Sequence, residues 1–195
     1  MSKFGDIVTF INTTLKSTQF GSSRFQKGTF NDSIAELVKV TTEGETIPSI
    51  VANDGQATKV VIDDVEVFQV YHRLLGSSYE LVGDDFGNYR TRRTIAQMTL
   101  VVIANRDRLK LDKEDIILGL SLGMPLELPN IDKTALLIEA CNITPNTYLT
   151  GPTEAYDREY NITEKLLKPQ TMMIALDYTI TMDVKEGCVT MCTDE

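Results

Sequence analysis

The amino-acid sequence predicts an α+β fold: a mainly antiparallel sheet with a long hairpin and two helices packed on it. Three observations lead to this prediction. Apolar and polar residues alternate strictly over Leu176–Val184, which is typical of a strand with one buried and one polar face. Two long strand segments, Val65–Leu75 and Arg93–Asn105, flank a polar stretch that contains glycines. Apolar residues recur at helical spacing in Lys3–Ser17 and in Asp112–Leu122.

The two predicted helices are defined by their apolar stripes. The stripe of the helix over Lys3–Ser17 consists of Phe4, Ile7, Val8, Ile11 and Leu15. The helix over Asp112–Leu122 has Asp112 as its N-cap, and acidic residues in its first turn favour the positive end of the helix dipole. Its expected buried residues are Ile116, Ile117 and Leu120. Pro125 prevents the helix from continuing.

The segment Thr18–Ser33 between the first helix and the strands has neither a helical nor a strand period. We therefore expect a long loop. Its three phenylalanines, Phe20, Phe25 and Phe30, are five residues apart, a spacing that suits neither a helix face nor a strand face. They anchor the loop either to the chain's own core or to a neighbouring subunit.

Short strands are expected before the hairpin, at Ile34–Thr41, Ile47–Val51 and Thr58–Ile62. Pro48 has no backbone N–H to donate, which suggests that the middle strand lies at an edge. In the second arm of the hairpin, the continuous apolar run Leu100–Ile103 predicts a central strand that is covered on both faces.

Further strands are expected after the second helix, at Leu136–Ile143, Tyr156–Ile162 and Met172–Val184. A chain of 195 residues is expected to form a single domain, residues 1–195, with a loop-rich insertion at residues 126–169. The longest apolar runs are too short to span a bilayer, so we expect no membrane partner.

Charge is unevenly distributed along this acidic chain, which has a net charge of −9. Residues 1–29 contain four Lys/Arg against one Asp, and residues 90–113 contain seven Lys/Arg against two Asp. The net charge argues against bulk affinity for nucleic acid. Basic segments on an acidic body offer complementary surfaces for self-association, although a chance difference between loops explains them equally well.

The residues that carry chemistry in other proteins are few and scattered here. His72 is the only histidine, so a site with several histidines is excluded, and we expect a packed or interface side chain rather than a catalytic one. Cys141, Cys188 and Cys192 are an odd number of cysteines, expected to be reduced thiols in an intracellular setting. No glycine-rich phosphate-binding motif occurs. We therefore expect no catalytic, cofactor-binding or metal-binding residues, no cofactor, and no enzymatic activity.

Basic residues gather at both ends of the second hairpin arm. With the neighbouring tyrosine, they are Tyr89, Arg90, Arg92, Arg93, Arg106 and Arg108. Such residues bind phosphates, pair with carboxylates of another subunit, or simply lie in solvent at strand ends. The net negative charge favours carboxylates over phosphates. Together with the three phenylalanines of the predicted loop, these residues are the candidate interface residues.

The order of elements resembles that of the tail-terminator and neck (head-to-tail joining) proteins of tailed bacteriophages. The matching parts are Phe4–Leu15, Val65–Asn105, Asp112–Leu122 and Met172–Val184, about half of the chain. The resemblance implies a non-enzymatic structural subunit of a virion, assembled in the host cytoplasm, that forms a ring which joins or caps the tail tube.

The same resemblance implies the partners. They are further copies of this chain, other tail, neck or portal proteins of the virion, and DNA that passes through the lumen of the ring without specific binding. The long hairpin and the phenylalanine-bearing loop would contact the neighbours. The alternative is a protein- or nucleic-acid-binding module that acts through a patch formed by Arg90, Arg92 and Arg93.

Overall fold

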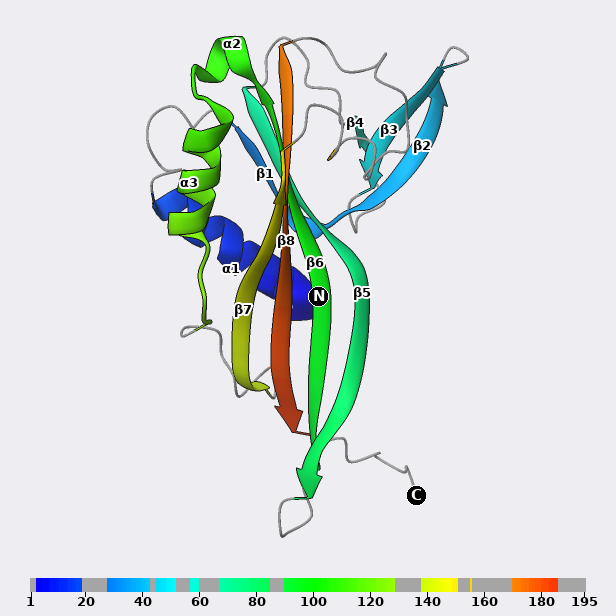
Figure 1. Ribbon diagram of the computed structural model, residues 1–195. Helices are drawn as coiled ribbons and strands as arrows, with labels where there is room; N and C mark the ends of the chain where they lie inside the picture. Colours follow the sequence, from blue (N-terminus) through cyan, green and yellow to red (C-terminus); the bar gives the residue numbers. More distant parts are fainter. Residues whose placement is uncertain are drawn as a thin grey trace.

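The fold is built on one large, mostly antiparallel sheet. The computed structural model describes residues 3–18, 28–42, 45–51, 57–59, 67–84, 90–128, 138–150, 155 and 170–185. The five strands of the sheet are β1 (Thr29–Ile34), β5 (Phe68–Asp84), β6 (Arg90–Asn105), β7 (Ile138–Leu149) and β8 (Thr171–Lys185). They lie in the order β1-β5-β6-β8-β7 (Figure 1). β1 is parallel to β5, and the other neighbours are antiparallel. The predicted α+β fold is confirmed.

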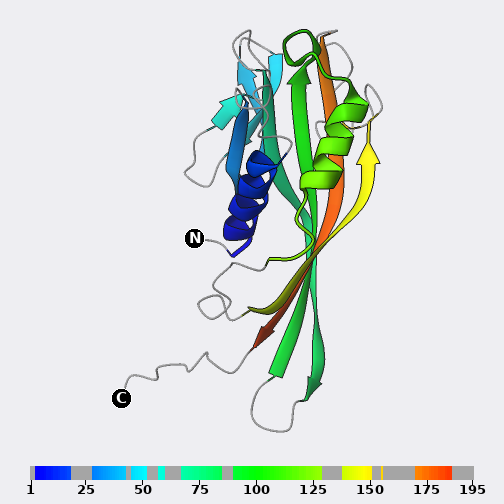
Figure 2. The same ribbon diagram turned by 90° about the vertical axis from the view of Figure 1, so that its left-hand side faces the viewer.

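Two helices pack on one face of this sheet (Figure 2). They are α1 (Lys3–Ser17), which has the predicted bounds, and α3 (Lys113–Gly123), which follows the four-residue α2 (Arg106–Leu109). The fully buried residues of the α1 stripe are Ile7, Val8, Ile11 and Leu15. In α3, Ile116 and Leu120 join the same core as predicted. The Asp115 carboxylate accepts a hydrogen bond from the N–H of Asp112 at 3.4 Å, in keeping with the predicted N-cap.

The predicted long hairpin is formed by β5 and β6, which pair from Phe68 opposite Ala104 to Asp84 opposite Arg90. β5 has 17 residues and is therefore roughly 55 Å long at about 3.3 Å per residue. Its far half projects beyond both helices (Figures 1 and 2). The predicted first arm, Val65–Leu75, was too short, because Gly76-Ser77-Ser78 continues the strand after a bulge instead of ending it.

The centre of the sheet is covered on both faces, as the run Leu100–Ile103 predicted. All four of its residues are buried. Their side chains alternate, so that Leu100 and Val102 join the helix-side core while Val101 lies on the opposite face. The closing strand over Met172–Val184 is also confirmed, as β8.

The predicted loop over Thr18–Ser33 is wrong for its last residues, because Thr29–Ile34 forms the edge strand β1. Its sequence shows no alternation, and the strand forms through parallel pairing with β5. The Asn31 side-chain amide also donates to the carbonyl of Val70 at 3.0 Å. Tertiary pairing of this kind overrides weak local preference. Residues 19–27 lie outside the described part of the chain.

A second, three-stranded antiparallel sheet lies between β1 and β5 in the sequence. It consists of β2 (Glu36–Thr42), β3 (Glu45–Val51) and β4 (Ala57–Lys59), close to the three short strands that the sequence predicts. β3 is the middle strand rather than an edge. Pro48 is compatible with this place because the described pairing between β3 and β4 begins only at Ser49.

The described residues of the segment 126–169 contain one long regular element, the strand β7. β7 pairs with β8 from Ile138 to Leu149, so residues 138–149 are an integral edge strand of the main sheet. They extend the strand predicted at Leu136–Ile143. The strand predicted at Tyr156–Ile162 lies outside the described residues.

Candidate functional site

His72 lies in the core and both of its ring nitrogens are hydrogen bonded. The side chain is fully buried on β5, between α1 and β8. Its Nε2 is 2.9 Å from the Oδ1 of Asn12, and its Nδ1 is 2.8 Å from the hydroxyl of Tyr178. Because the carbonyl oxygen of Asn12 can only accept, Nε2 donates to it, and Nδ1 accepts a hydrogen bond from Tyr178. Burial keeps the imidazole neutral, so its single proton is on Nε2.

The orientation of Asn12 is fixed by the strand next to it. Its Nδ2 donates to the carbonyl of Asn31 and to the Oδ1 of Asp32, both at 2.9 Å. The network thus joins α1, β1, β5 and β8, and every donor and acceptor of its side-chain amide and imidazole is used. A network of this kind fixes one arrangement of its elements, since an unpaired polar group in the core is costly.

Burial sets the protonation states of this network. It lowers the pKa of His72 from 6.5 to about 3. It also raises the pKa of the Tyr178 hydroxyl above its usual value of 10. Both groups are neutral across the physiological range, and neither side chain reaches the surface. The predicted packed role of His72 fits this geometry.

Arg93 forms ion pairs within its own sheet. Its Nε and Nη2 donate to the two carboxylate oxygens of Asp183 at 2.8 and 3.0 Å, which is a bidentate pair across β6 and β8. Its Nη1 is 3.7 Å from the Oε1 of Glu80 on β5. The hydrogen bond with Asp183, followed by its charge, raises the pKa of Arg93. Of the three alternatives for these basic residues, Arg93 thus pairs with carboxylates, and both carboxylates belong to its own chain rather than to another subunit.

Arg92 directly precedes Arg93 on β6, so its side chain lies on the opposite face of the sheet. Its guanidinium carbon is 4.7 Å from the ring centroid of Tyr79, a cation–π contact. Arg92 and Arg93 therefore do not form one patch. Arg90 pairs with Asp84 in the backbone ladder, and Tyr89 lies outside the described residues.

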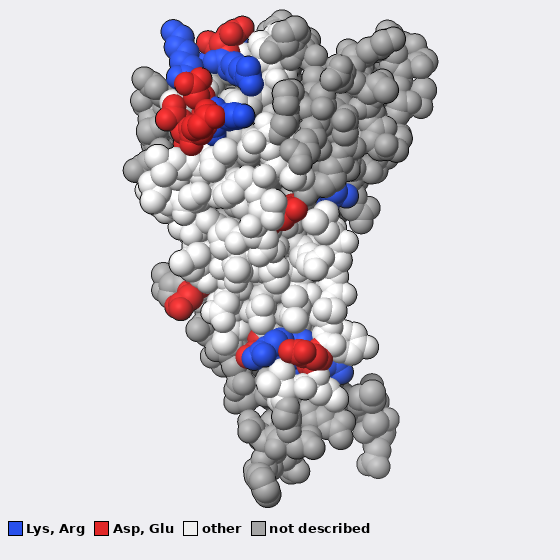
Figure 3. Space-filling view, in the orientation of Figure 1, with Lys and Arg blue, Asp and Glu red and all other residues white. Residues whose placement is uncertain are grey.

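Arg106 and Arg108 lie on α2, at the opposite end of β6 from Arg92 and Arg93. The side chain of Asn105 caps this turn by accepting hydrogen bonds from the N–H groups of Asp107 and Arg108. Figure 3 shows basic and acidic side chains together at this end of the molecule, and a second mixed cluster far from it. The candidate basic residues thus belong to two separate clusters.

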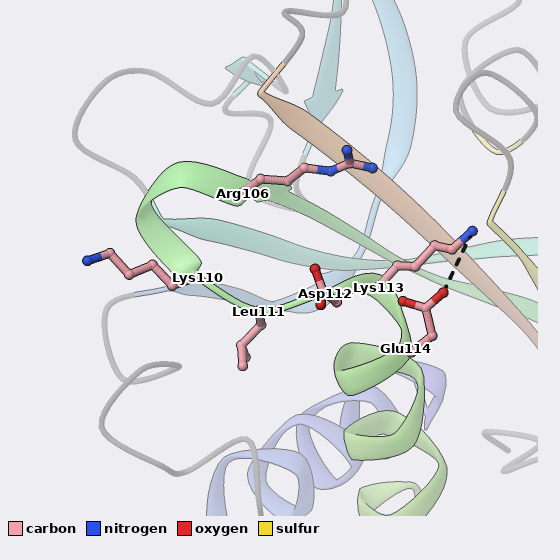
Figure 4. A pocket seen from close by; sticks show the side chains of 6 residues that line it. All are labelled: Arg106, Lys110, Leu111, Asp112, Lys113 and Glu114. Atoms are coloured by element: carbon pink, nitrogen blue, oxygen red, sulfur yellow. Dashed lines mark ion pairs between the residues drawn. The ribbon is translucent and has the colours of Figure 1, made fainter.

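A depression of about 250 Å³ lies where α2 meets α3 (Figure 4). Its lining residues are Arg106, Lys110, Leu111, Asp112, Lys113 and Glu114. Lys113 pairs with Glu114 at 4.0 Å, and the side chains of Lys110 and Arg106 point in different directions. The charges do not converge on one point, so this depression does not form an anion site.

Phe30 is the one phenylalanine of the predicted loop that the structure describes. It lies on β1 and packs edge-on against Phe68, with ring centroids 5.4 Å apart. The ammonium of Lys16 on α1 lies 5.0 Å from its ring centroid. These contacts favour anchoring to the chain's own core over contact with a neighbour. Phe20 and Phe25 lie outside the described residues.

Exposed apolar side chains mark two surfaces that sequence reasoning missed. One surface is on the projecting half of β5, where Tyr79 is 71% and Leu81 63% exposed. The other is on and after α3, with Leu118, Leu122 and Leu126. Tyr79 and Leu81 were not predicted to be surface residues of a strand, because they lie in the stretch that was expected to form the tip of the hairpin. Their alternation, Tyr79-Glu80-Leu81, is the signal that could have identified them as part of a strand.

Within the described part of the chain, no group of three or more His, Cys, Asp or Glu side chains is placed to hold a metal ion. The helices described are each too short or too polar to cross a membrane. No protein-family model matches the chain, and no curated protein is significantly similar to it.

Proposed function

We propose that the protein is a non-enzymatic structural subunit that works by association with copies of itself. The assembly proposed is a ring that joins or caps the tail tube of a bacteriophage, in the tail or the neck of the virion. The observation that carries this proposal is the β5–β6 hairpin, which projects beyond both helices with Tyr79 and Leu81 exposed. Tyr79 and Leu81 are two positions apart on one strand and so share a face, and neighbouring exposed apolar side chains of this kind commonly mark contacts between proteins.

The arrangement of elements supports the same proposal. The N-terminal helix, long hairpin, second helix and closing strand occur in the order that the phage tail-terminator and neck proteins have. The lone histidine, which an acyl-transfer or hydrolytic mechanism would use as its base, is buried and hydrogen bonded within the core. Its position supports a structural role for the residue.

The alternative, a protein- or nucleic-acid-binding module acting through a patch of Arg90, Arg92 and Arg93, has less support. Arg93 is held by Asp183 and Glu80, and Arg92 lies on the other face of the sheet. A patch that grips phosphates needs its guanidinium groups on one surface. The separation of Arg92 and Arg93 onto two faces is the observation that weakens this alternative.

Sedimentation velocity of the full chain tests the proposal. We expect a discrete species heavier than the 21.8 kDa of one chain, in slow exchange or none with the monomer. A sedimentation profile that fits one 21.8 kDa species at every protein concentration, also in the presence of purified phage tail proteins, would contradict it.

A further inference from the structure

Among the residues that the structure describes, none pairs with the outer edge of the projecting hairpin. β1 pairs with β5 only as far as His72, so the strand continues over Leu74–Asp84 with β6 on one side and no described segment on the other. In both ribbon views no helix or strand lies along the edge of this half of β5 that faces away from β6 (Figures 1 and 2). An open edge presents backbone N–H and C=O groups that a further extended strand can pair with.

This edge lacks the residues that usually protect sheets from pairing. Between Leu74 and Asp84 there is no lysine and no proline. Glu80 is the one charged residue between them, and its carboxylate is directed to Arg93 of the same sheet. Two bulges interrupt the ladder, one after Leu74 and one after Leu81, and leave Gly76–Leu81 as a regular stretch. Six residues are the length of an ordinary strand.

We infer that the edge strand β5 pairs antiparallel with β5 of a second copy of this chain, about a two-fold axis at Tyr79. A two-fold axis perpendicular to the sheet keeps each face on its own side, so opposed residues must share a face. With the axis at Tyr79, the two Tyr79 rings face each other, Ser77 faces Leu81 of the second copy, and Ser78 faces Glu80.

Charge and ring chemistry select this register over its neighbours. An axis at Glu80 places two carboxylates directly opposite each other, which is destabilising. Axes at Ser77 or Leu81 run into a bulge within two residues. An axis at Ser78 places Tyr79 opposite Ser77, whereas the axis at Tyr79 forms an aromatic pair at the most exposed apolar side chain of the arm. The second copy is therefore the occupant whose edge matches this one.

This inference rests on the proposed function only in that the chain associates with itself. Beyond the proposed function, it specifies which surface forms one of the contacts between copies, the edge of β5, and the two-fold symmetry of that contact. A two-fold contact of this kind joins two subunits, or two rings through their arms, and is distinct from the contacts that close a ring. The two proposals can therefore fail separately.

Cysteine cross-linking tests the register without changing Tyr79. Ser78→Cys and Glu80→Cys are introduced separately in a chain with Cys188→Ser and Cys192→Ser, while the buried Cys141 stays. Opposed Cα atoms of antiparallel strands are about 4.5–5.5 Å apart, within the range of a disulfide. We expect mild oxidation to cross-link a mixture of the two variants, and either variant alone much less. Efficient cross-linking of Ser78→Cys alone, or none in the mixture, would overturn the inference.

A charge at the axis supplies the second measurement. Tyr79→Lys places two ammonium groups opposite each other, and we expect the dimer dissociation constant to rise at least tenfold, measured by sedimentation equilibrium. Leu118→Lys on α3, also an exposed apolar residue, is the matched control and is expected to leave that constant unchanged. Equal constants for Tyr79→Lys and the wild type would contradict the two-fold contact. Rings seen for a chain that fails both measurements would leave the proposed function standing.

Discussion

Replacing His72 with alanine is expected to lower the free energy of unfolding by about 3–5 kcal/mol. Two effects add. The substitution opens a cavity at a fully buried position, and it leaves the Asn12 carbonyl and the Tyr178 hydroxyl without their partner. Because Asn12 lies on α1 and adds a polar link to its apolar packing on the sheet, the loss should appear as weaker protection of α1 amides as well. Urea denaturation and hydrogen exchange measure the two effects.

Tyr178→Phe is the control for this prediction, because it keeps the ring and removes the hydroxyl alone. Nδ1 of His72 then has no donor, and we expect a loss of about 1–2 kcal/mol, smaller than that of His72→Ala. A loss below about 0.5 kcal/mol for His72→Ala, the range of ordinary surface substitutions, would show that the network does not hold α1 to the sheet.

Acidification is expected to destabilise the protein through the same histidine. In the unfolded chain His72 titrates near 6.5, whereas burial lowers its pKa to about 3 in the folded chain. Protonation therefore favours unfolding. The stability is fully present above pH 6.5 and is lost as the pH falls toward 3, by about 1.4 kcal/mol per pH unit. The neighbours that face the imidazole are Asn12 and the neutral Tyr178, with the Asp32 carboxylate beyond Asn12.

The variant His72→Gln isolates this contribution from that of the carboxylates, because glutamine does not titrate. We expect the difference in unfolding free energy between the wild type and His72→Gln to be constant above pH 7. Below pH 6.5 it should change with the stated slope, in the direction of a less stable wild type. Parallel stability curves for the two proteins from pH 7 to pH 4 would contradict a neutral, buried His72.

The sequence predicts the elements whose pattern depends on burial alone. Lys3–Ser17 presents one apolar stripe to one core, and its helix has the predicted bounds. Leu176–Val184 lies in the interior of the sheet between β6 and β7, with one face in the core, so its alternation is complete. In both cases the physical cause of the pattern, contact with a single apolar layer, acts along the whole element.

Elements that depend on distant partners were not predictable in the same way. β1 owes its conformation to parallel pairing with β5, whose residues Gln69 and Val70 lie about forty positions further along the chain. Gly76-Ser77-Ser78 has the composition of a turn, yet it pairs with β6 because the ladder on either side holds it extended. The local conformational preference of the residues predicts neither the strand β1 nor the extended conformation of Gly76-Ser77-Ser78.

The candidate sites also differ in whether they depend on distant residues or on the local strand pattern. Nothing in the sequence brings Asn12 and Tyr178, 60 and 106 residues from His72, to one imidazole. The opposite faces of Arg92 and Arg93, by contrast, follow from strand alternation once Arg92 is included in the strand. The predicted strand began at Arg93, one residue after Arg92. Arg92 was therefore placed outside the strand, and the alternation that separates the two arginines was not applied to it.

Electron microscopy of the purified full chain, in negative stain, tests the central claim most directly: that this protein acts through surfaces that join its copies. We expect particles with rotational symmetry: single rings, or stacked pairs of rings that contact each other through the projecting hairpins. A field of small separate particles with no common assembly, at concentrations where sedimentation shows one 21.8 kDa species, would contradict it.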